Sequence, residues 1–304
     1  MKRWGGLALP SAQRQGEPCM KKKTSDRITM ILILVLLVGL SLLLYPSVSD
    51  YWNSFHQSRA IAGYAEEVAN LDTDRYDRLW ADAIAYNAAL ARGEVAYTLT
   101  DEQRAEYESL LDVSGTGIMG YVEIPGIACS LPIYHGTDDA ALQIAAGHLE
   151  WTSLPTGGAN THCVISGHRG LPSAKLFTDL DRLEEGDVFM LCVLDEVLTY
   201  QVDQILIVEP QDTTALQIVP GEDYCTLVTC TPYRINTHRL LVRGHRIENM
   251  KEAKATVAVA DAIQIEPLIV APIVAIPMLL MLVFILLLPR QPRKKRGSDA
   301  DEEE

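Results

Sequence analysis

The chain has 304 residues, with 40 acidic against 26 basic side chains and a formal net charge of −14. Nucleic-acid binding requires a basic face that matches the phosphates, so this composition argues against a nucleic-acid partner. An acidic surface keeps a protein soluble, and it also tolerates a cationic partner such as a protein that presents lysine. Solubility is the simpler explanation of the charge.

The first predicted segments are a polar stretch, residues 1–27, and a membrane helix, residues 28–49. Residues 1–19 show no periodicity, and Met20 with the three lysines after it would itself be a natural start, so residues 1–19 are either a genuine part of the chain or an extension. Residues 28–49 are uncharged and have the length of roughly 20 apolar residues that crosses a bilayer. A cleaved signal peptide is the alternative, but no small-residue cleavage site follows closely, and we favour an uncleaved anchor.

Residues 50–115 are expected to be helical. Ala60, Tyr64 and Val68 recur at the spacing of one helix face. Thr100 begins a Thr-Asp-Glu-Gln run that resembles a capping box, which predicts a second helix ending near Leu111.

Residues 116–248 change to a β pattern. Short runs rich in Val, Ile, Leu and Tyr alternate with Gly, Pro and Asp turns. The candidate strands are residues 120–124, 128–134, 161–166, 187–194, 197–208, 224–230 and 239–247. Seven or so strands at this spacing favour a closed barrel or a sandwich over a parallel sheet.

The chain ends with a linker, residues 249–266, a second apolar stretch, residues 267–289, and a tail, residues 290–304. The second stretch is also uncharged and long enough to cross a bilayer. Lys and Arg flank the outer side of both apolar stretches, which places both termini in the cytoplasm and the domain between them outside the cell.

Cysteine usage separates one thiol from the others. Cys19 is predicted to be cytoplasmic, which leaves five outer cysteines, and an odd number cannot all pair within one chain. Four of the five lie within strand-like runs and are interpreted as small buried hydrophobes: Cys129, Cys163, Cys192 and Cys225. Cys230 differs because it lies where a strand ends.

Cys230, His168 and Arg239 form the candidate catalytic set. His168 follows another strand and has a glycine before it and a glycine two residues after it, so its ring is expected to be accessible as an acid–base partner for the thiol. Arg239 stays charged and suits an oxyanion or a substrate carbonyl. The alternative is a set of structural residues with no catalytic role.

Zinc binding is a second candidate chemistry for the same region. His162, Cys163, His168, Cys225 and Cys230 include ligand types for zinc. However, Cys225 and Cys230 are five residues apart and therefore point to opposite faces of one strand. No Cys-x₂-Cys pair occurs, so we predict no metal site.

The strand ends resemble the active-site signature of sortases, the cell-wall transpeptidases of Gram-positive bacteria, and among them the pilin-polymerising class C. The resemblance rests on the runs Thr226-Leu227-Val228-Thr229-Cys230-Thr231-Pro232-Tyr233, Asn236-Thr237-His238-Arg239-Leu240-Leu241-Val242-Arg243-Gly244, Ser166-Gly167-His168-Arg169-Gly170 and Gly120-Tyr121-Val122-Glu123-Ile124-Pro125. It covers roughly residues 50–250, and a membrane segment after the domain also fits class C.

The resemblance implies a mainly β fold, a closed eight-stranded sortase barrel with N-terminal helices, flanked by two transmembrane helices. It implies Cys230 as nucleophile, His168 as acid/base and Arg239 as the oxyanion-stabilising or substrate-positioning residue, with Thr229 and Leu227 lining the substrate groove. The implied reaction cuts an LPxTG-like signal between Thr and Gly and passes the acyl group to a pilin lysine. No cofactor is implied, and we expect a monomer.

Class C sortases often carry an Asp-Pro-aromatic lid motif before the barrel, and this sequence has none there. Residues 92–99 take its place. Tyr97 is a candidate aromatic plug over the active site and Glu94 a candidate anionic contact; an ordinary interhelical loop is the alternative. Two alternative functions stay open: a housekeeping sortase that attaches surface proteins to the cell wall, and a non-enzymatic pilus-base or surface protein.

Overall fold

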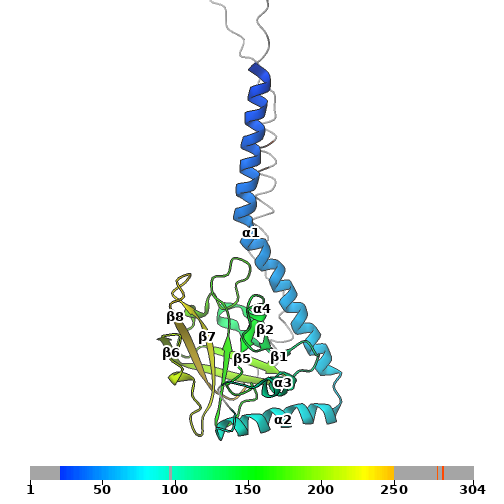
Figure 1. Ribbon diagram of the computed structural model, residues 1–304, viewed down its shortest axis with the longest axis vertical. Coiled ribbons are helices and arrows are strands. Elements are labelled where there is room, and N and C mark those ends of the chain that lie inside the picture. Colours follow the sequence, from blue (N-terminus) through cyan, green and yellow to red (C-terminus); the bar gives the residue numbers. More distant parts are fainter. Residues whose placement is uncertain (1–20, 96–97, 250–278, 280–282, 284–304) are drawn as a thin grey trace, which may run out of the picture. The chain divides into compact units, whose positions relative to one another are not determined.

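A computed structural model describes residues 21–95, 98–249, 279 and 283, with the side chains of residues 21–26 left out (Figure 1). The chain divides into two compact units, and the unit Leu44–Leu268 holds all of the β-structure. The helices are α1 (Lys21–Ala69), α2 (Thr73–Ala91), α3 (Asp101–Ser109) and α4 (Asp139–Leu142). The strands are β1 (Ile118–Ile124), β2 (Cys129–His135), β3 (Ala146–His148), β4 (Thr161–Ser166), β5 (Val188–Val193), β6 (Glu196–Val208), β7 (Asp223–Thr231) and β8 (His238–Arg246). Short 3₁₀ turns cover Pro125–Ile127, Leu180–Arg182 and Thr214–Leu216.

The eight strands close into a barrel in the order β1-β2-β3-β4-β7-β8-β6-β5, because β5 pairs back onto β1. All neighbours are antiparallel except two parallel pairs, β2 with β3 and β4 with β7. The predicted closed eight-stranded barrel is confirmed. All seven strand-like runs of the sequence are strands, and the eighth is β3, which has only three residues.

Three buried side chains attach the helices to the barrel. The Tyr64 hydroxyl of α1 donates to the Met119 carbonyl at 3.1 Å and accepts from the Leu194 amide at 2.8 Å. Asn87 of α2 exchanges two hydrogen bonds with the backbone of Leu154, at 2.7 and 3.0 Å. The Tyr107 hydroxyl of α3 lies 2.8 Å from Nδ1 of the buried His148. Because each bond is made in a buried place, the helices are held at defined positions.

The predicted helix starts and stops are close to those observed. The capping box at Thr100 is confirmed, since its hydroxyl accepts from the Gln103 amide and the Gln103 side chain accepts from the Thr100 amide. The helix ends at Ser109 rather than near Leu111. In α2, the Asp72 side chain caps the first turn by accepting from the Arg75 amide at 2.7 Å.

The β7 side chains alternate between two apolar clusters. Cys225 and Leu227 point into the main core inside the barrel. Val228 lies on the outer face in a second cluster with Val164, Leu216 and Leu241. This alternation has period two, so Cys230 lies on the same outer face as Val228.

Among the described residues, one helix is long and apolar enough to cross a membrane, and it is the N-terminal helix α1. This judgement rests on length and composition. The second predicted membrane segment, residues 267–289, lies outside the described residues apart from 279 and 283. The predicted domain boundaries and the two-span topology stay predictions.

Candidate active site

Cys230 and Arg239 are direct cross-strand partners. Cys230 is next to the last residue of β7, and the antiparallel register places it opposite Arg239 near the start of β8. Paired residues share one face of a sheet, so both side chains lie on the outer face of the barrel. Both are half-buried. A thiol and a guanidinium therefore lie side by side at one end of the barrel.

His168 lies beside this pair on the other side of β7. The parallel register pairs Ser166 of β4 with Val228, and the Gly167 amide continues the ladder by donating to the Val228 carbonyl at 3.0 Å. Two residues beyond Ser166 and Val228 come His168 and Cys230. The three candidate catalytic residues thus occupy one row across the ends of β4, β7 and β8. His168 is half-buried, so its ring is partly open to solvent.

The backbone around His168 is fixed from two sides. The Thr229 hydroxyl donates to the Gly167 carbonyl at 2.8 Å, and the Phe177 amide donates to the His168 carbonyl at 3.1 Å. The Phe177 ring also covers Gly167, where an added Cβ would lie 2.6 Å from ring atom Cδ2. Only glycine leaves space for a fully buried phenylalanine at this distance. This packing holds the loop that carries the imidazole.

The Arg239 guanidinium donates hydrogen bonds to the local backbone. It donates to the Asn236 carbonyl at 3.4 Å and to the His238 carbonyl at 3.2 Å. None of the salt bridges within the described part of the chain includes Arg239. A cation without a carboxylate partner is suited to a transient negative charge on a neighbouring oxygen.

Thr229 and Leu227 lie differently from the expected groove lining. Both point to the inner side of β7, where Leu227 is 0% and Thr229 1% exposed. Leu227 packs in the barrel core, and Thr229 bonds to the Gly167 carbonyl. On this part of β7, the side chains that reach the outer face are those of Val228 and Cys230.

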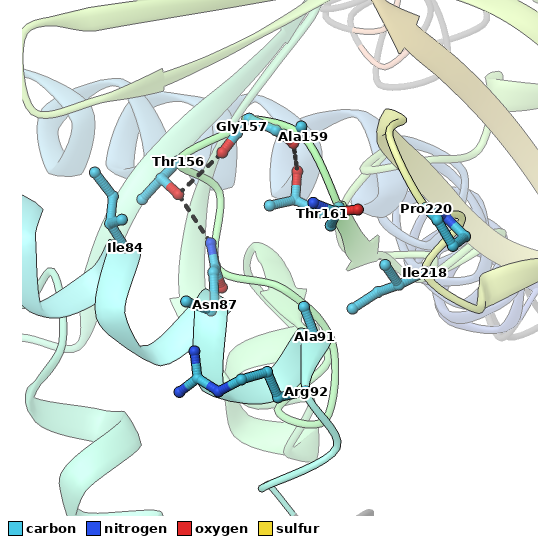
Figure 2. A pocket seen from close by; sticks show the side chains of 13 residues that line it. Ile84, Asn87, Ala91, Arg92, Thr156, Gly157, Ala159, Thr161, Ile218 and Pro220 are labelled. Atoms are coloured by element: carbon cyan, nitrogen blue, oxygen red, sulfur yellow. Dashed lines mark hydrogen bonds between the residues drawn. The ribbon is translucent and has the colours of Figure 1, made fainter.

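Glu94, the candidate anionic contact of a lid, lies in an ion pair with its neighbour Arg92. Its carboxylate pairs with Arg92 at 2.7 Å, and hydrogen bonding to Arg92 lowers the pKa of this exposed carboxyl. Arg92 lines a cavity of about 570 Å³ together with Thr161, the first residue of β4 (Figure 2). That is the end of the barrel opposite Cys230, since Cys230 lies about 20 Å further along β7 at about 3.3 Å per residue. Tyr97 lies outside the described residues.

Arg169 is a site residue that the sequence did not single out. Its side chain is only 9% exposed and forms an ion pair with Asp181. Its Nη1 donates to the Thr231 hydroxyl at 3.4 Å, and its guanidinium lies 5.8 Å from the centre of the Tyr233 ring. One buried cation thus connects the residue after His168 to the residue after Cys230. Its position inside the Ser-Gly-His-Arg-Gly run was the only available signal.

Three of the other described cysteines have a thiol pKa that burial raises, and the fourth, Cys163, is enclosed in the barrel. All five described cysteines are free of disulfides. Burial raises the pKa of Cys129 and of Cys192 to about 12, and burial raises that of Cys225 well above its ordinary value. Cys163 is 2% exposed and lies opposite Cys225 in the register of β4 with β7, inside the barrel. Among the described residues, no group of three or more His, Cys, Asp or Glu side chains is arranged to hold a metal.

This chain is similar to known proteins both in sequence and in architecture. Residues 122–247 match the Sortase domain. The solved structure of sortase C1 from Streptococcus agalactiae is 50% identical, with a TM-score of 0.61, and the match covers 63% of this chain and 100% of that one. The chain belongs to the sortase family. The class C resemblance is confirmed by this structure and by that of Clostridium perfringens sortase C with the C-terminal cell wall sorting motif, 43% identical with a TM-score of 0.57, covering 63% of this chain and 100% of that one.

A more distant relative is Sortase A of Streptococcus agalactiae serotype III (strain NEM316). It is 28% identical over 160 residues, which are 50% of this sortase and 64% of that relative. This sortase thus aligns with somewhat less than two thirds of that relative's length. Sortases are cysteine transpeptidases, and the row of Cys230, His168 and Arg239 contains the groups that such chemistry requires.

Proposed function

We propose that this sortase is a membrane-anchored transpeptidase that joins pilin subunits outside the cell. It cleaves an LPxTG-like sorting signal between Thr and Gly, and it transfers the threonyl acyl group to a lysine amine of another pilin. Cys230 is the nucleophile, His168 the acid–base group, and Arg239 the residue that stabilises negative charge. The cross-strand pairing of Cys230 with Arg239, on the outer face and beside the His168 loop, carries this proposal.

In the first half-reaction the Cys230 thiol gives its proton to His168. The sulfur attacks the threonine carbonyl carbon, and the carbonyl oxygen takes the negative charge of the tetrahedral intermediate. The Arg239 guanidinium neutralises that charge. The protonated His168 then donates its proton to the departing glycine amine, the C–N bond breaks, and a thioester to Cys230 remains.

In the second half-reaction a neutral lysine amine attacks the thioester carbonyl. His168 removes a proton from the attacking nitrogen, and Arg239 again faces the oxyanion. The C–S bond breaks, an isopeptide bond remains, and the thiol of Cys230 is restored by the proton on His168. Water in place of the amine gives hydrolysis, so exclusion of water decides the ratio of transfer to cleavage.

Replacement of Cys230 tests the nucleophile. Full-length Cys230→Ala is expected to lose cleavage of an LPxTG-like peptide and to form no acyl-enzyme detectable by mass spectrometry. Cys129→Ala is the matched control: its half-buried side chain lies 3.7 Å from the Leu176 carbonyl oxygen, and its removal should leave turnover within about twofold. Normal turnover by Cys230→Ala would overturn the proposal.

The acceptor is tested separately. The enzyme is given the donor peptide with either a pilin carrying its lysine or a cell-wall peptide amine. Preferential joining to the pilin lysine is the expected result, and preferential use of the cell-wall amine would favour the housekeeping function instead. Failure of the wild type to acylate at all would favour the non-enzymatic alternative.

A further inference from the structure

The part of α1 that follows the predicted membrane span contacts the loop behind His168. Asp50 is the first residue after the span 28–49, and its carboxylate accepts from the Lys175 amide at 2.6 Å. Asn53, one turn later, donates to the Ser173 carbonyl at 2.7 Å. These bonds connect the start of the outer domain to the loop between His168 and Phe177. That loop therefore contacts α1 only a few residues after the predicted end of the membrane span.

The turn that follows Cys230 lies against the same loop. An added Cβ at Gly170 would lie 2.9 Å from the Tyr233 ring, so this ring packs directly against the Gly170 backbone. The guanidinium of Arg169 is also close to this ring, at 5.8 Å. The turn 232–237 is thus at the same end of the barrel as Lys175 and Asp50, whereas α2 crosses the other end (Figure 1).

The surface at this end has the composition of a membrane-contacting segment. In the turn, Tyr233 is 45% and Ile235 is 67% exposed, with the exposed Arg234 between them. On α1, Trp52 is 64% and Phe55 50% exposed. Aromatic side chains and arginine gather at the membrane–water interface, because an apolar body is buried there while a polar or charged group stays hydrated. These exposed aromatic and apolar side chains and Arg234 form a surface without acidic residues among them, whereas the whole chain has a net charge of −14.

We propose that the end of the barrel that carries the active site rests on the membrane surface, with the Tyr233–Ile235 turn in contact with lipid. The row of His168, Cys230 and Arg239 then opens at the bilayer rather than into the surrounding medium. This proposal rests on the proposed function of a membrane-anchored transpeptidase, and it specifies the substrate class: a sorting signal held close to the same membrane by its own protein. The occupant of the surface is the lipid bilayer.

Lipid crosslinking tests the contact directly. The full-length sortase is placed in phosphatidylcholine–phosphatidylglycerol nanodiscs, with a benzophenone amino acid in place of Ile235, Val219 or Leu36. Leu36 lies in the predicted span, and Val219 is 41% exposed beside the residues that line the cavity at the opposite end. Illumination should give lipid adducts at positions 36 and 235 and none at 219. Adducts at 36 without 235, equal labelling of 219 and 235, or no adduct at 36 would each overturn the proposal.

An activity comparison tests the consequence. Ile235→Asn should cleave a soluble sorting-signal peptide at the wild-type rate, because Ile235 is exposed and lies outside the catalytic row. The same signal on a protein anchored in the nanodisc should be cleaved about five- to tenfold more slowly, since partial burial of one isoleucine corresponds to that range. Equal loss on both substrates, or no loss on the anchored one, would overturn the proposal. A wild type that cleaves neither substrate would disprove the proposed function, while the crosslinking would still report on lipid contact.

Discussion

Replacement of Gly167 by alanine should damage the site through a single methyl group. The added Cβ would lie 2.6 Å from Cδ2 and 2.9 Å from Cγ of Phe177. Ordinary carbon–carbon contacts are about 3.5–4.0 Å, so the overlap is about 1 Å. Phe177 is 0% exposed and cannot move into solvent without disturbing the core.

The overlap can be relieved in two ways, and each has a measurable cost. If Phe177 moves, overpacking costs about 1–3 kcal/mol of unfolding free energy. If the backbone moves, His168 is displaced, because the Phe177 amide is bonded to the His168 carbonyl at 3.1 Å. A displacement of about 1 Å can reduce a catalysed rate by about 10²-fold. We expect a loss divided between stability and rate.

Urea unfolding and peptide cleavage are measured on the same full-length preparation. Gly63→Ala is the matched control, since nothing lies within 4 Å of its added Cβ and it lies inside α1. That control should keep the rate and gain up to about 1 kcal/mol from the higher helix propensity of alanine. A second change, Phe177→Leu, should restore part of the lost rate. If Gly167→Ala unfolds and turns over like the wild type, the packing argument for the His168 loop is refuted.

Three further predictions concern other parts of the unit. Asn87→Ala should cost about 2–3 kcal/mol in urea unfolding, because it leaves the buried Leu154 backbone groups without their partner; a loss below about 0.5 kcal/mol would contradict this. Arg169→Gln should lower the cleavage rate and alter its pH profile, because the connection to Thr231 is lost; an unchanged profile would make Arg169 merely structural. Burial lowers the pKa of His162, so the unfolded chain binds the proton more tightly. Stability should therefore fall as pH drops below about 6.5, and His162→Gln should flatten that dependence in urea midpoints measured at several pH values.

Most strands of the barrel were predictable from the sequence, because seven of them coincide with runs of β-branched and aromatic residues bounded by turns. Strand β3 was not predictable, since its three residues, Ala146–His148, are too few to show a periodic pattern. The capping box at Thr100 was predictable because all of its partners lie within four residues. Local signals were sufficient where the interacting groups are local.

The sequence predicted which residues lie near the candidate site better than it predicted the strand face to which each side chain points. Strand alternation separates Leu227 and Thr229 from Cys230 by parity, and that rule would have assigned the first two to the core. The burial of Arg169 was not predictable in this way, because it depends on Asp181 and Tyr233 arriving from other parts of the fold. The position of Glu94 likewise follows from the direction of α2, which no local pattern encodes.

The parallel pairing of β4 with β7 has a consequence for the newly made chain. Ser166 and Val228, which align His168 with Cys230, are 62 residues apart in sequence, and they become neighbours through the pairing of β4 with β7. Contacts between such distant residues form late, after the entropy of closing the intervening loop has been overcome. A chain that is still folding therefore carries the Cys230 thiol before the His168 imidazole lies beside it. Under the proposed function, acyl-transfer chemistry is switched on by completion of the fold, so an incompletely folded chain stays inert.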